Sequence, residues 1–360
     1  MEHQPIRGPR GLMVERSTRH NIPLTAIVEL THRCNEQCIH CYVVQPIGKS
    51  KNELSTAEWK KALQQLAAEG TMEITFSGGE PLLRDDLFDI LREARRLNFA
   101  IKLSTNATLV GRREAEELGR LKLWEVGVSL YAAEETVHDA ITKVAGSFRK
   151  TVRGVRFMIE QGLRVKIRSV LMRQNFGNEA TLKALADELG ASFAQDPLMT
   201  PVSNGSHDNL VHRLSRGQLR QSLIPDLDKF SQDFDPERWE AIKLDKLHSN
   251  MCKAGINFCC ISTEGKVLPC VQFQLVAGDL REQSFHDVWR SSPVFLKLRK
   301  TFNRDLSTCG DCRLLPICFR CPGEALLSDG HAFGPSSWAC MRSELIEELY
   351  REKRARAQEL

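Results

Sequence analysis

The sequence predicts an α/β protein, namely a partial (βα)6 barrel followed by a small cysteine-rich domain and a C-terminal helix. Two observations support this fold class. Short apolar runs alternate with amphipathic helical segments from residue 26 to about residue 200, which is the pattern of parallel βα units. The alternation then stops, and nine of the twelve cysteines fall in the next part of the chain, between residues 252 and 340.

The repeated unit is a short apolar strand followed by a helix. Ser55 opens the first of these helices, Glu58 completes a capping box with it, and Gly70 ends the helix. Six units are too few for a closed eight-stranded barrel, and they favour an open one whose strand ends place the chemistry on one face. The expected strands cover residues 26–30, 72–76, 100–104, 124–130, 164–172 and 191–197. The other expected helices cover residues 87–97, 113–118, 148–161 and 179–189.

The organisation along the chain follows from where this alternation holds. We expect a partly irregular lead-in over residues 1–25 and the barrel over 26–200. A linker with short helices should cover residues 201–250, and the cysteine-rich domain residues 251–340. Residues 341–360 read as a charged helix with a solvated face.

Composition excludes several classes of protein. Hydrophobic residues make up 42% of the chain and charged residues 27%, which is enough apolar content for a sizeable core. A net charge of +4 is too small to indicate nucleic-acid binding. No apolar run could span a membrane, and the N-terminus has no secretory signal pattern. We therefore expect a cytoplasmic protein, in which thiols stay reduced and grouped cysteines bind metal.

The first group of cysteines follows the first strand as C-x3-C-x2-C, and consists of Cys34, Cys38 and Cys41. Three thiolates in one loop can hold three irons of a [4Fe–4S] cube and leave the fourth iron open to another ligand. A zinc site completed by His32 or His40 fits the spacing about equally well.

A second motif, Ser77-Gly78-Gly79-Glu80-Pro81, follows the second strand. Two glycines allow the backbone to approach a ligand closely, and a neighbouring carboxylate can bind an ammonium group. Taken alone, the segment also fits a simple βα turn. Its position after the second strand places it on the same face as the cysteine triplet.

Together the two motifs resemble those of the radical S-adenosylmethionine (SAM) superfamily, and the resemblance covers roughly residues 24–200. It implies that the open iron is chelated by SAM, and that one electron cleaves SAM to a 5′-deoxyadenosyl radical, which abstracts a hydrogen atom. Many relatives read S-L-D-G after the fourth strand, where this chain has Ser129-Leu130-Tyr131-Ala132, so no aspartate role is transferred. The SAM contacts that the resemblance implies are Gly78, Gly79, Glu80, Asn106, Ser129 and Arg168.

The remaining cysteines resemble the SPASM extension of such enzymes, which binds auxiliary [4Fe–4S] clusters. The relatives usually have three residues before the last cysteine of the C-x2-C-x5-C-x2-C quartet, where this chain has two. Two zinc knuckles are the alternative for this region. The resemblance implies a first auxiliary cluster on Cys252, Cys259, Cys270 and Cys321, with Cys260 as the spare thiol, and a second on Cys309, Cys312, Cys318 and Cys340.

The resemblance implies SAM and three [4Fe–4S] clusters as cofactors, and a peptide or protein as substrate. Our primary hypothesis is a maturase of a ribosomally made peptide, by crosslinking, oxidation or epimerisation. We expect a separate recognition protein or direct leader binding, because residues before Ala26 are too few for a recognition domain. A flavodoxin- or ferredoxin-type protein would donate electrons, with no nucleic acid or membrane involved. The alternatives are an enzyme of haem or tetrapyrrole biosynthesis and a non-catalytic iron–sulfur electron carrier.

The sequence identifies no catalytic acid or base. His207, His212 and Tyr131 fall in positions that could face the mouth of the barrel. Each of these residue types is more often found at the surface or in packing, so none is assigned a role.

Overall fold

The computed structural model describes residues 8–44, 52–227 and 236–358. Six parallel strands form the barrel part of its sheet in the order β6-β5-β4-β3-β2-β1, which confirms the predicted partial barrel. These strands are β1 (Thr25–Thr31), β2 (Glu73–Gly78), β3 (Ala100–Thr105), β4 (Glu125–Ser129), β5 (Val165–Val170) and β6 (Ser192–Asp196).

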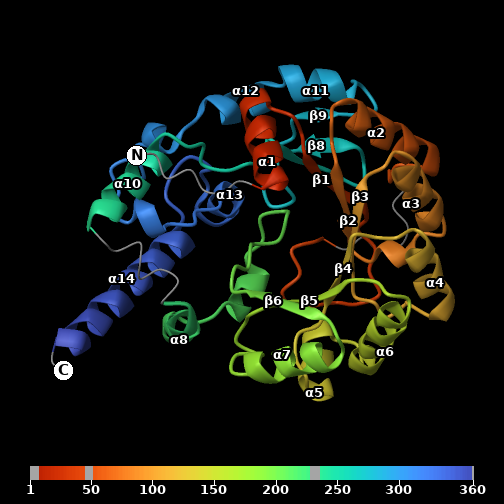
Figure 1. The fold of residues 1–360 in the computed structure, drawn as a ribbon, viewed down its shortest axis with the longest axis horizontal. Coiled ribbons are helices and arrows are strands. Elements are labelled where there is room, and N and C mark those ends of the chain that lie inside the picture. The colour runs from red at the N-terminus through yellow and green to blue at the C-terminus, as the bar shows by residue number, and fades with distance from the viewer. Residues whose placement is uncertain (1–7, 45–51, 228–235, 359–360) are drawn as a thin grey trace.

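Helices cover the outer face of this curved sheet, as Figure 1 shows for α2, α3, α4 and α6. Ala26, Val28 and Leu30 of β1 point into the apolar layer between sheet and helices and are fully buried. The predicted capping box is present, because Ser55 and Glu58 bond reciprocally at the start of the first of these helices. The helices are α2 (Thr56–Ala68), α3 (Leu87–Arg96), α4 (Arg112–Arg120), α5 (Glu135–Thr142), α6 (Ser147–Glu160) and α7 (Glu179–Glu188).

The inner face of the sheet is the concave side of the partial barrel, and we call it the lumen. It carries paired charges near the N-terminal ends of the strands, such as Lys102 with Glu73 at 2.7 Å and Arg168 with Glu125 at 2.7 Å. The polar and cysteine side chains of the site lie at the opposite, C-terminal ends of the strands.

The cysteine-rich region extends the same sheet beyond β1. Strand β7 (Phe258–Ile261) pairs in parallel with β1, and β8 (Lys266–Leu268) and β9 (Gly278–Asp279) follow in antiparallel pairing. The sheet therefore has nine strands in the part of the chain that the structure describes. The sequence did not indicate this continuity.

Helices α11 (Phe285–Ser291) and α12 (Pro293–Lys300) follow β9 and complete the apolar core of the barrel. Phe285, Trp289 and Phe295 are fully buried in the same cluster as the β1 side chains. Burial of three aromatic side chains stabilises this part by several kcal/mol. The region is thus packed against the barrel through apolar side chains.

The lead-in that we expected to be partly irregular contains helix α1 (Pro9–His20), with Pro9 at its first position and Asn21 in a left-handed cap. It packs on the cysteine-rich region, where Asn257 donates to Ser17 and the Trp289 indole donates to the Asn21 carbonyl at 2.7 Å. Figure 1 shows α1 beside α12.

A second apolar cluster includes Leu219, Trp338 and Ile346. Its residues come mainly from α8 (Arg216–Leu223), α10 (Pro236–Leu247), η6 (Leu315–Ile317) and α14 (Ser337–Gln358). The predicted C-terminal helix begins at Ser337, earlier than expected, and so includes Cys340. In the described ranges no helix has the length and apolarity needed to cross a bilayer. The other short elements are η1 (Pro81–Leu83), η2 (Asp208–His212), η3 (Ile224–Asp226), η5 (Asn303–Asp305) and α13 (Pro322–Asp329).

Candidate active site and cluster-binding sites

A cavity of about 310 Å³ lies at the C-terminal ends of the barrel strands. This is the face on which parallel βα folds place their chemistry. Of the nine residues predicted for the first cluster and SAM, seven line this cavity, and Glu80 and Arg168 do not. The seven are Cys34, Cys38, Cys41, Gly78, Gly79, Asn106 and Ser129.

The loop with the three cysteines is held from two sides. The backbone N–H groups of Gln37 and Ile39 donate to the carbonyls of Thr142 and Ile141, both at 3.0 Å, at the end of α5. On the other side, Asn106 after β3 donates to the Asn35 side-chain oxygen at 2.9 Å. Helix α5, which the sequence did not predict, therefore supports the cysteine loop.

The two glycines of the second motif are required by protein packing. Gly79 donates to the Thr31 carbonyl at 2.7 Å, and Glu80 donates to the Arg33 carbonyl at 2.8 Å. A Cβ on Gly78 or Gly79 would lie 2.2 Å from a backbone oxygen of Thr31 or Arg33. Gly78 also has φ +123°, a conformation that side chains disfavour. The motif thus packs directly against the start of the cysteine loop.

Glu80 is fully buried below the cavity wall. Its carboxylate accepts from the Thr105 hydroxyl and from the backbone N–H of Asn106 at 2.8 Å, and also from the N–H of Leu82. Burial raises the pKa of Glu80 from 4.5 to about 7, against the lowering effect of these donors. The placement makes Glu80 a positioning residue for the end of β3, and a contact with the SAM amino group stays a prediction.

Ser129 and Arg168 are paired across β4 and β5, on the lumen face. Ser129 lines the cavity, whereas the Arg168 guanidinium lies across Gly127 and binds Glu125 at the opposite end of β4. Of these two predicted SAM contacts, only Ser129 therefore lies at the cavity, because the Arg168 side chain turns away from it.

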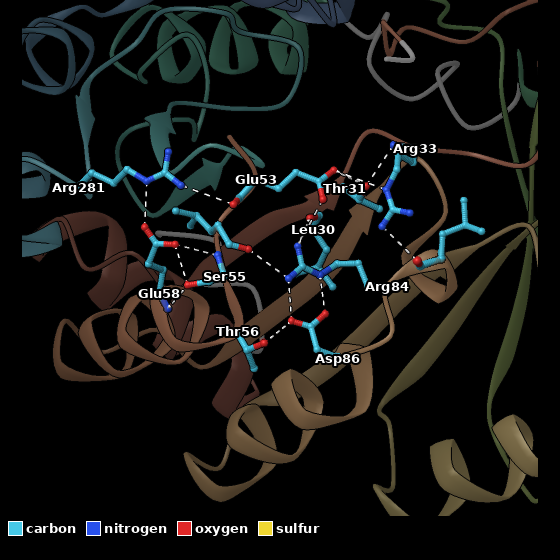
Figure 2. Close-up of polar contacts among 12 residues, drawn as sticks. Leu30, Thr31, Arg33, Glu53, Ser55, Thr56, Glu58, Arg84, Asp86 and Arg281 are labelled. Atoms are coloured by element: carbon cyan, nitrogen blue, oxygen red, sulfur yellow. Dashed lines mark hydrogen bonds and ion pairs between the residues drawn. The ribbon is translucent and has the colours of Figure 1, made fainter. Parts of the chain in front are cut away.

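A buried ion network ties the chain after the cysteine loop back to β1 (Figure 2). Arg84 donates to the carbonyls of Leu30 and Leu54 and binds Asp86 through two nitrogens at 2.8 and 2.9 Å. Glu53 lies 3.7 Å from Arg84 and accepts from the Thr31 hydroxyl at 2.5 Å. The end of β1, from which the cysteine loop leaves, is thus fixed to the start of α2.

The electrostatics of the cavity suit an iron–sulfur cluster. Burial raises the pKa of Cys34 to about 12, and it also raises the pKa of Cys38 and Cys41. Among the described residues that line the cavity none is Lys or Arg, so no protein cation stabilises these thiolates. Iron would supply the missing positive charge, because metal coordination deprotonates a thiol.

Cys252, Cys270 and Cys321 approach one another beside the lumen. Burial raises the pKa of Cys270 to about 12, and the nearby thiols of Cys252 and Cys321 add to the rise. Cys321 donates to the Gln272 side-chain oxygen at 3.5 Å, and Gln272 lines the first cavity. One side chain therefore connects the first auxiliary site to the cavity.

Cys259 and Cys260, predicted as ligand and spare thiol, are neighbours on β7 and lie on opposite faces of the strand. Cys259 belongs to the apolar core under the outer helices, with Ile261 and Val267. Cys260 lies outside that cluster, and the neighbouring Cys270 contributes to raising its pKa. Strand alternation separates the two side chains.

The second auxiliary site is a cavity of about 320 Å³ near the start of α14. All four cysteines predicted for it line this cavity. They come from the loop before α13 and, for the last, from α14 itself, and they are Cys309, Cys312, Cys318 and Cys340.

The three residues weighed as acid or base differ in position. Tyr131 lines the first cavity and packs edge-on against His40 with ring centroids 4.6 Å apart. His207 bonds the Leu327 carbonyl and His212 bonds the Gln174 side chain, both outside the residues that line the cavity. Only Tyr131 can contact a molecule bound there.

Two protein-family models match the chain. The radical SAM superfamily model matches residues 28–185, and the SPASM model, an iron–sulfur cluster-binding domain, matches residues 252–313. The first match contains the cysteine triplet and the glycine motif, and the second contains Cys252 through Cys312.

Curated relatives of two kinds align over most of the chain. A PqqA peptide cyclase of Rhodopseudomonas palustris is 30% identical over 359 residues, which are 93% of this chain and 91% of that protein. An AdoMet-dependent heme synthase of Methanosarcina barkeri is 28% identical over 331 residues, with 86% and 94% covered.

Solved structures share the fold. Streptococcus suis SuiB bound to its precursor peptide SuiA superposes with a TM-score of 0.69 at 19% identity, covering 94% of this chain and 82% of SuiB. The enzyme anSMEcpe with bound AdoMet gives a TM-score of 0.67 at 18% identity, with 92% and 98% covered. With a relative at 30% identity over nearly its whole length, this chain belongs to the radical SAM superfamily as an enzyme with a SPASM iron–sulfur domain.

Proposed function

We propose that this enzyme matures a ribosomally made peptide, with SAM and the first cluster bound in the cavity at the strand ends. The arrangement that supports this most directly is the convergence of three thiols and the glycine motif on one cavity. When bound there, the cluster would supply the electron for reductive cleavage of SAM, and SAM would supply the radical chemistry that removes a hydrogen atom from the substrate.

The chain's own residues would bind and orient the cofactors. Cys34, Cys38 and Cys41 would hold three irons, and the loop that carries them is fixed by α5 and Asn106. Ser129 and the glycine backbone would contact SAM along the cavity wall. Enclosure at the strand ends would limit water near the reacting atoms, which protects a reactive intermediate.

The uncharged part of the cavity lining favours a peptide side chain as substrate. It includes Val170, Leu198, Met199 and Thr200. An iron porphyrin carries several propionates, which need cations, and the described lining offers no Lys or Arg. The relation to a peptide cyclase and the fold shared with a peptide-bound enzyme agree with this preference.

We further propose three [4Fe–4S] clusters, two of them auxiliary. Full cysteine ligation of both auxiliary clusters would favour electron transfer over direct binding of substrate to iron. A separate recognition protein or direct leader binding would present the peptide. A flavodoxin- or ferredoxin-type donor would deliver the electron, and the protein would work in the reducing cytoplasm.

Tetrapyrrole chemistry is the second candidate, because the heme synthase relative aligns over 94% of its own length. The non-catalytic electron carrier has no such support, since the family is one of enzymes and the cavity with its glycine motif is intact.

The test is anaerobic reconstitution followed by SAM cleavage with dithionite. We expect about 12 iron atoms per chain and formation of 5′-deoxyadenosine. The PqqA peptide, which the name of the cyclase relative gives as its substrate, and Fe-coproporphyrin III are then supplied in parallel, and the products are analysed by mass spectrometry. A mass change confined to the peptide supports the proposal, and one confined to the porphyrin contradicts it. The Cys38→Ala variant, lacking one thiolate of the first site, is the control for both substrates.

A further inference from the structure

We propose that Cys260, and not Cys259, is the fourth cysteine ligand of the first auxiliary cluster, together with Cys252, Cys270 and Cys321. The inference rests on the proposed iron–sulfur function of this region. It concerns which of two adjacent thiols the fold directs toward that site. The resemblance to SPASM relatives implied the other cysteine, Cys259.

The register of β7 against β1 separates the two thiols. Cys259 pairs with Ala26, and Cys260 pairs with Ile27. Ala26 faces the outer helices and is fully buried in the main apolar core. Because neighbouring side chains on a strand point to opposite faces, Cys259 shares that outer face and Cys260 faces the lumen.

Strand β8 gives the same assignment independently. Ile261 pairs with Val267, and both belong to the main apolar core, as Cys259 does. Cys260 pairs with Leu268, and neither belongs to that core. Two strand pairings therefore agree that Cys259 lies on the core face of the sheet and Cys260 on the other.

The surroundings of Cys259 leave no room for a cluster. Its cluster of buried side chains includes Trp289 and Phe295, both fully buried. The charged group beside Cys259 is Arg299, which stacks on the Trp289 ring at 4.5 Å and donates to the Gly255 carbonyl at 2.8 Å. A cube on this face would have to displace close-packed aromatic side chains, which costs several kcal/mol.

Cys260 lies on the side of the sheet where the other three proposed ligands gather. Cys270 is among the groups that act on the Cys260 thiol, and Cys270 is in turn close to Cys252 and Cys321. Glu29 faces Cys260 from β1 and accepts from the Tyr42 hydroxyl at 3.0 Å. Tyr42 follows Cys41 in the chain, so this face leads from the first auxiliary site toward the first cavity.

The experiment compares Cys259→Ala with Cys260→Ala in a parent chain whose Cys34, Cys38 and Cys41 are also alanine. The parent isolates the auxiliary clusters, and we expect it to bind about 8 iron atoms per chain. Iron, labile sulfide and the EPR spectrum of the reduced protein are measured for each variant, so no activity enters the readout.

We expect Cys260→Ala to lose about half of the parent's iron and one EPR signal, while Cys259→Ala keeps both clusters. The remaining signal from the second auxiliary site shows that the Cys260→Ala chain is folded. The proposal is overturned if Cys259→Ala loses the iron and Cys260→Ala keeps it, or if the two variants behave alike.

A second pair of variants covers the case in which Cys260→Ala fails to fold. Cys260→Ser or Cys260→Asp would keep a ligand at the site but replace sulfur by oxygen, which shifts the EPR g-values of the first auxiliary cluster. The same change at position 259 should leave the g-values unaltered, and the opposite pattern overturns the proposal.

The parent chain also separates this inference from the proposed function. If the parent binds zinc instead of iron, both this inference and the assignment of iron–sulfur clusters are wrong. If the parent binds its full iron but the wild-type enzyme leaves peptides unmodified, only the proposed substrate is contradicted.

Discussion

The buried carboxylate of Glu80 accepts a hydrogen bond of 2.8 Å from the backbone N–H of Asn106. This contact joins the glycine motif after β2 to the end of β3. Asn106 in turn holds the cysteine loop through Asn35 and places its own amide 3.8 Å from the Cys34 sulfur. Three segments that are distant in sequence are therefore positioned by one buried acid, which makes its protonation state relevant to stability.

The first prediction concerns pH. Burial raises the pKa of Glu80 from 4.5 to about 7, so the folded chain holds this proton more tightly than the unfolded chain. The stabilisation from the proton is complete below pH 4.5 and is lost as pH rises through 7. We expect the free energy of unfolding of wild type to fall by on the order of 1–3 kcal/mol relative to Glu80→Gln between about pH 5.5 and about pH 8.

The measurement is urea unfolding of both chains under anaerobic conditions across this range. Glu93→Gln is the control, since hydrogen bonding to Arg96 lowers the pKa of Glu93 to about 2, and this acid does not titrate in the window. A wild-type curve parallel to that of Glu80→Gln contradicts the prediction.

The second prediction concerns the close contact of the glycine motif with the cysteine loop. Gly79→Ala would place a Cβ 2.2 Å from the Arg33 carbonyl oxygen, so the loop has to move. We expect a loss of about 1–3 kcal/mol in stability and weaker SAM binding, measured by equilibrium dialysis of the reconstituted enzyme.

The matched control is Gly217→Ala in helix α8, where an added Cβ meets nothing within 4 Å. Alanine favours a helix over glycine by up to about 1 kcal/mol, so this variant should be as stable as wild type or more so. Unchanged SAM binding in Gly79→Ala would show that the loop can give way without affecting the cavity.

The barrel could be predicted from the sequence because its strands and helices have distinct periods. The run over residues 164–172 and the capped helix that starts after Ser55 both appear in the structure, as β5 and α2. Helix α5 was missed because it has only eight residues and follows β4 after a short turn. Its support of the cysteine loop is a tertiary contact that no local pattern signals.

The orientation of single side chains was harder to predict. Cys259 and Cys260 are both fully buried, so β7 has no alternation of apolar and polar residues from which its faces could be assigned. Arg168 lies on the predicted strand and face, but its long side chain turns to Glu125. Both choices depend on partners supplied by β1 and β4, which are distant in sequence.

The third prediction separates Ser129 from Arg168. Ser129 lines the cavity, and Arg168 is held at the far end of β4 by Glu125 at 2.7 Å. We expect Ser129→Ala to weaken SAM binding by about 1 kcal/mol, the usual size of one hydrogen bond, or about fivefold in Kd. Arg168→Ala should leave the Kd for SAM within about twofold, since its ion pair is partly exposed. A larger effect of Arg168→Ala than of Ser129→Ala would restore the arginine as a SAM contact.

The last prediction concerns the network in Figure 2. The Arg84 side chain is 7% exposed and binds two carbonyls besides Asp86. Its removal leaves these buried acceptors unpaired and takes from Glu53 the nearer of two cations, since Arg33 lies 4.0 Å from the Glu53 carboxylate. We expect Arg84→Ala to lower the free energy of unfolding by about 3–5 kcal/mol. Arg281→Ala breaks the half-exposed pair with Glu58 and a long hydrogen bond of 3.5 Å to the Glu53 carbonyl, and it should cost less than about 1 kcal/mol. Urea unfolding of the two variants measures this difference. Arg84 also fixes the start of the cysteine loop, so the Arg84→Ala variant should bind less iron at the first site than the Arg281→Ala variant. Equal stability of the two variants would contradict the role assigned to Arg84.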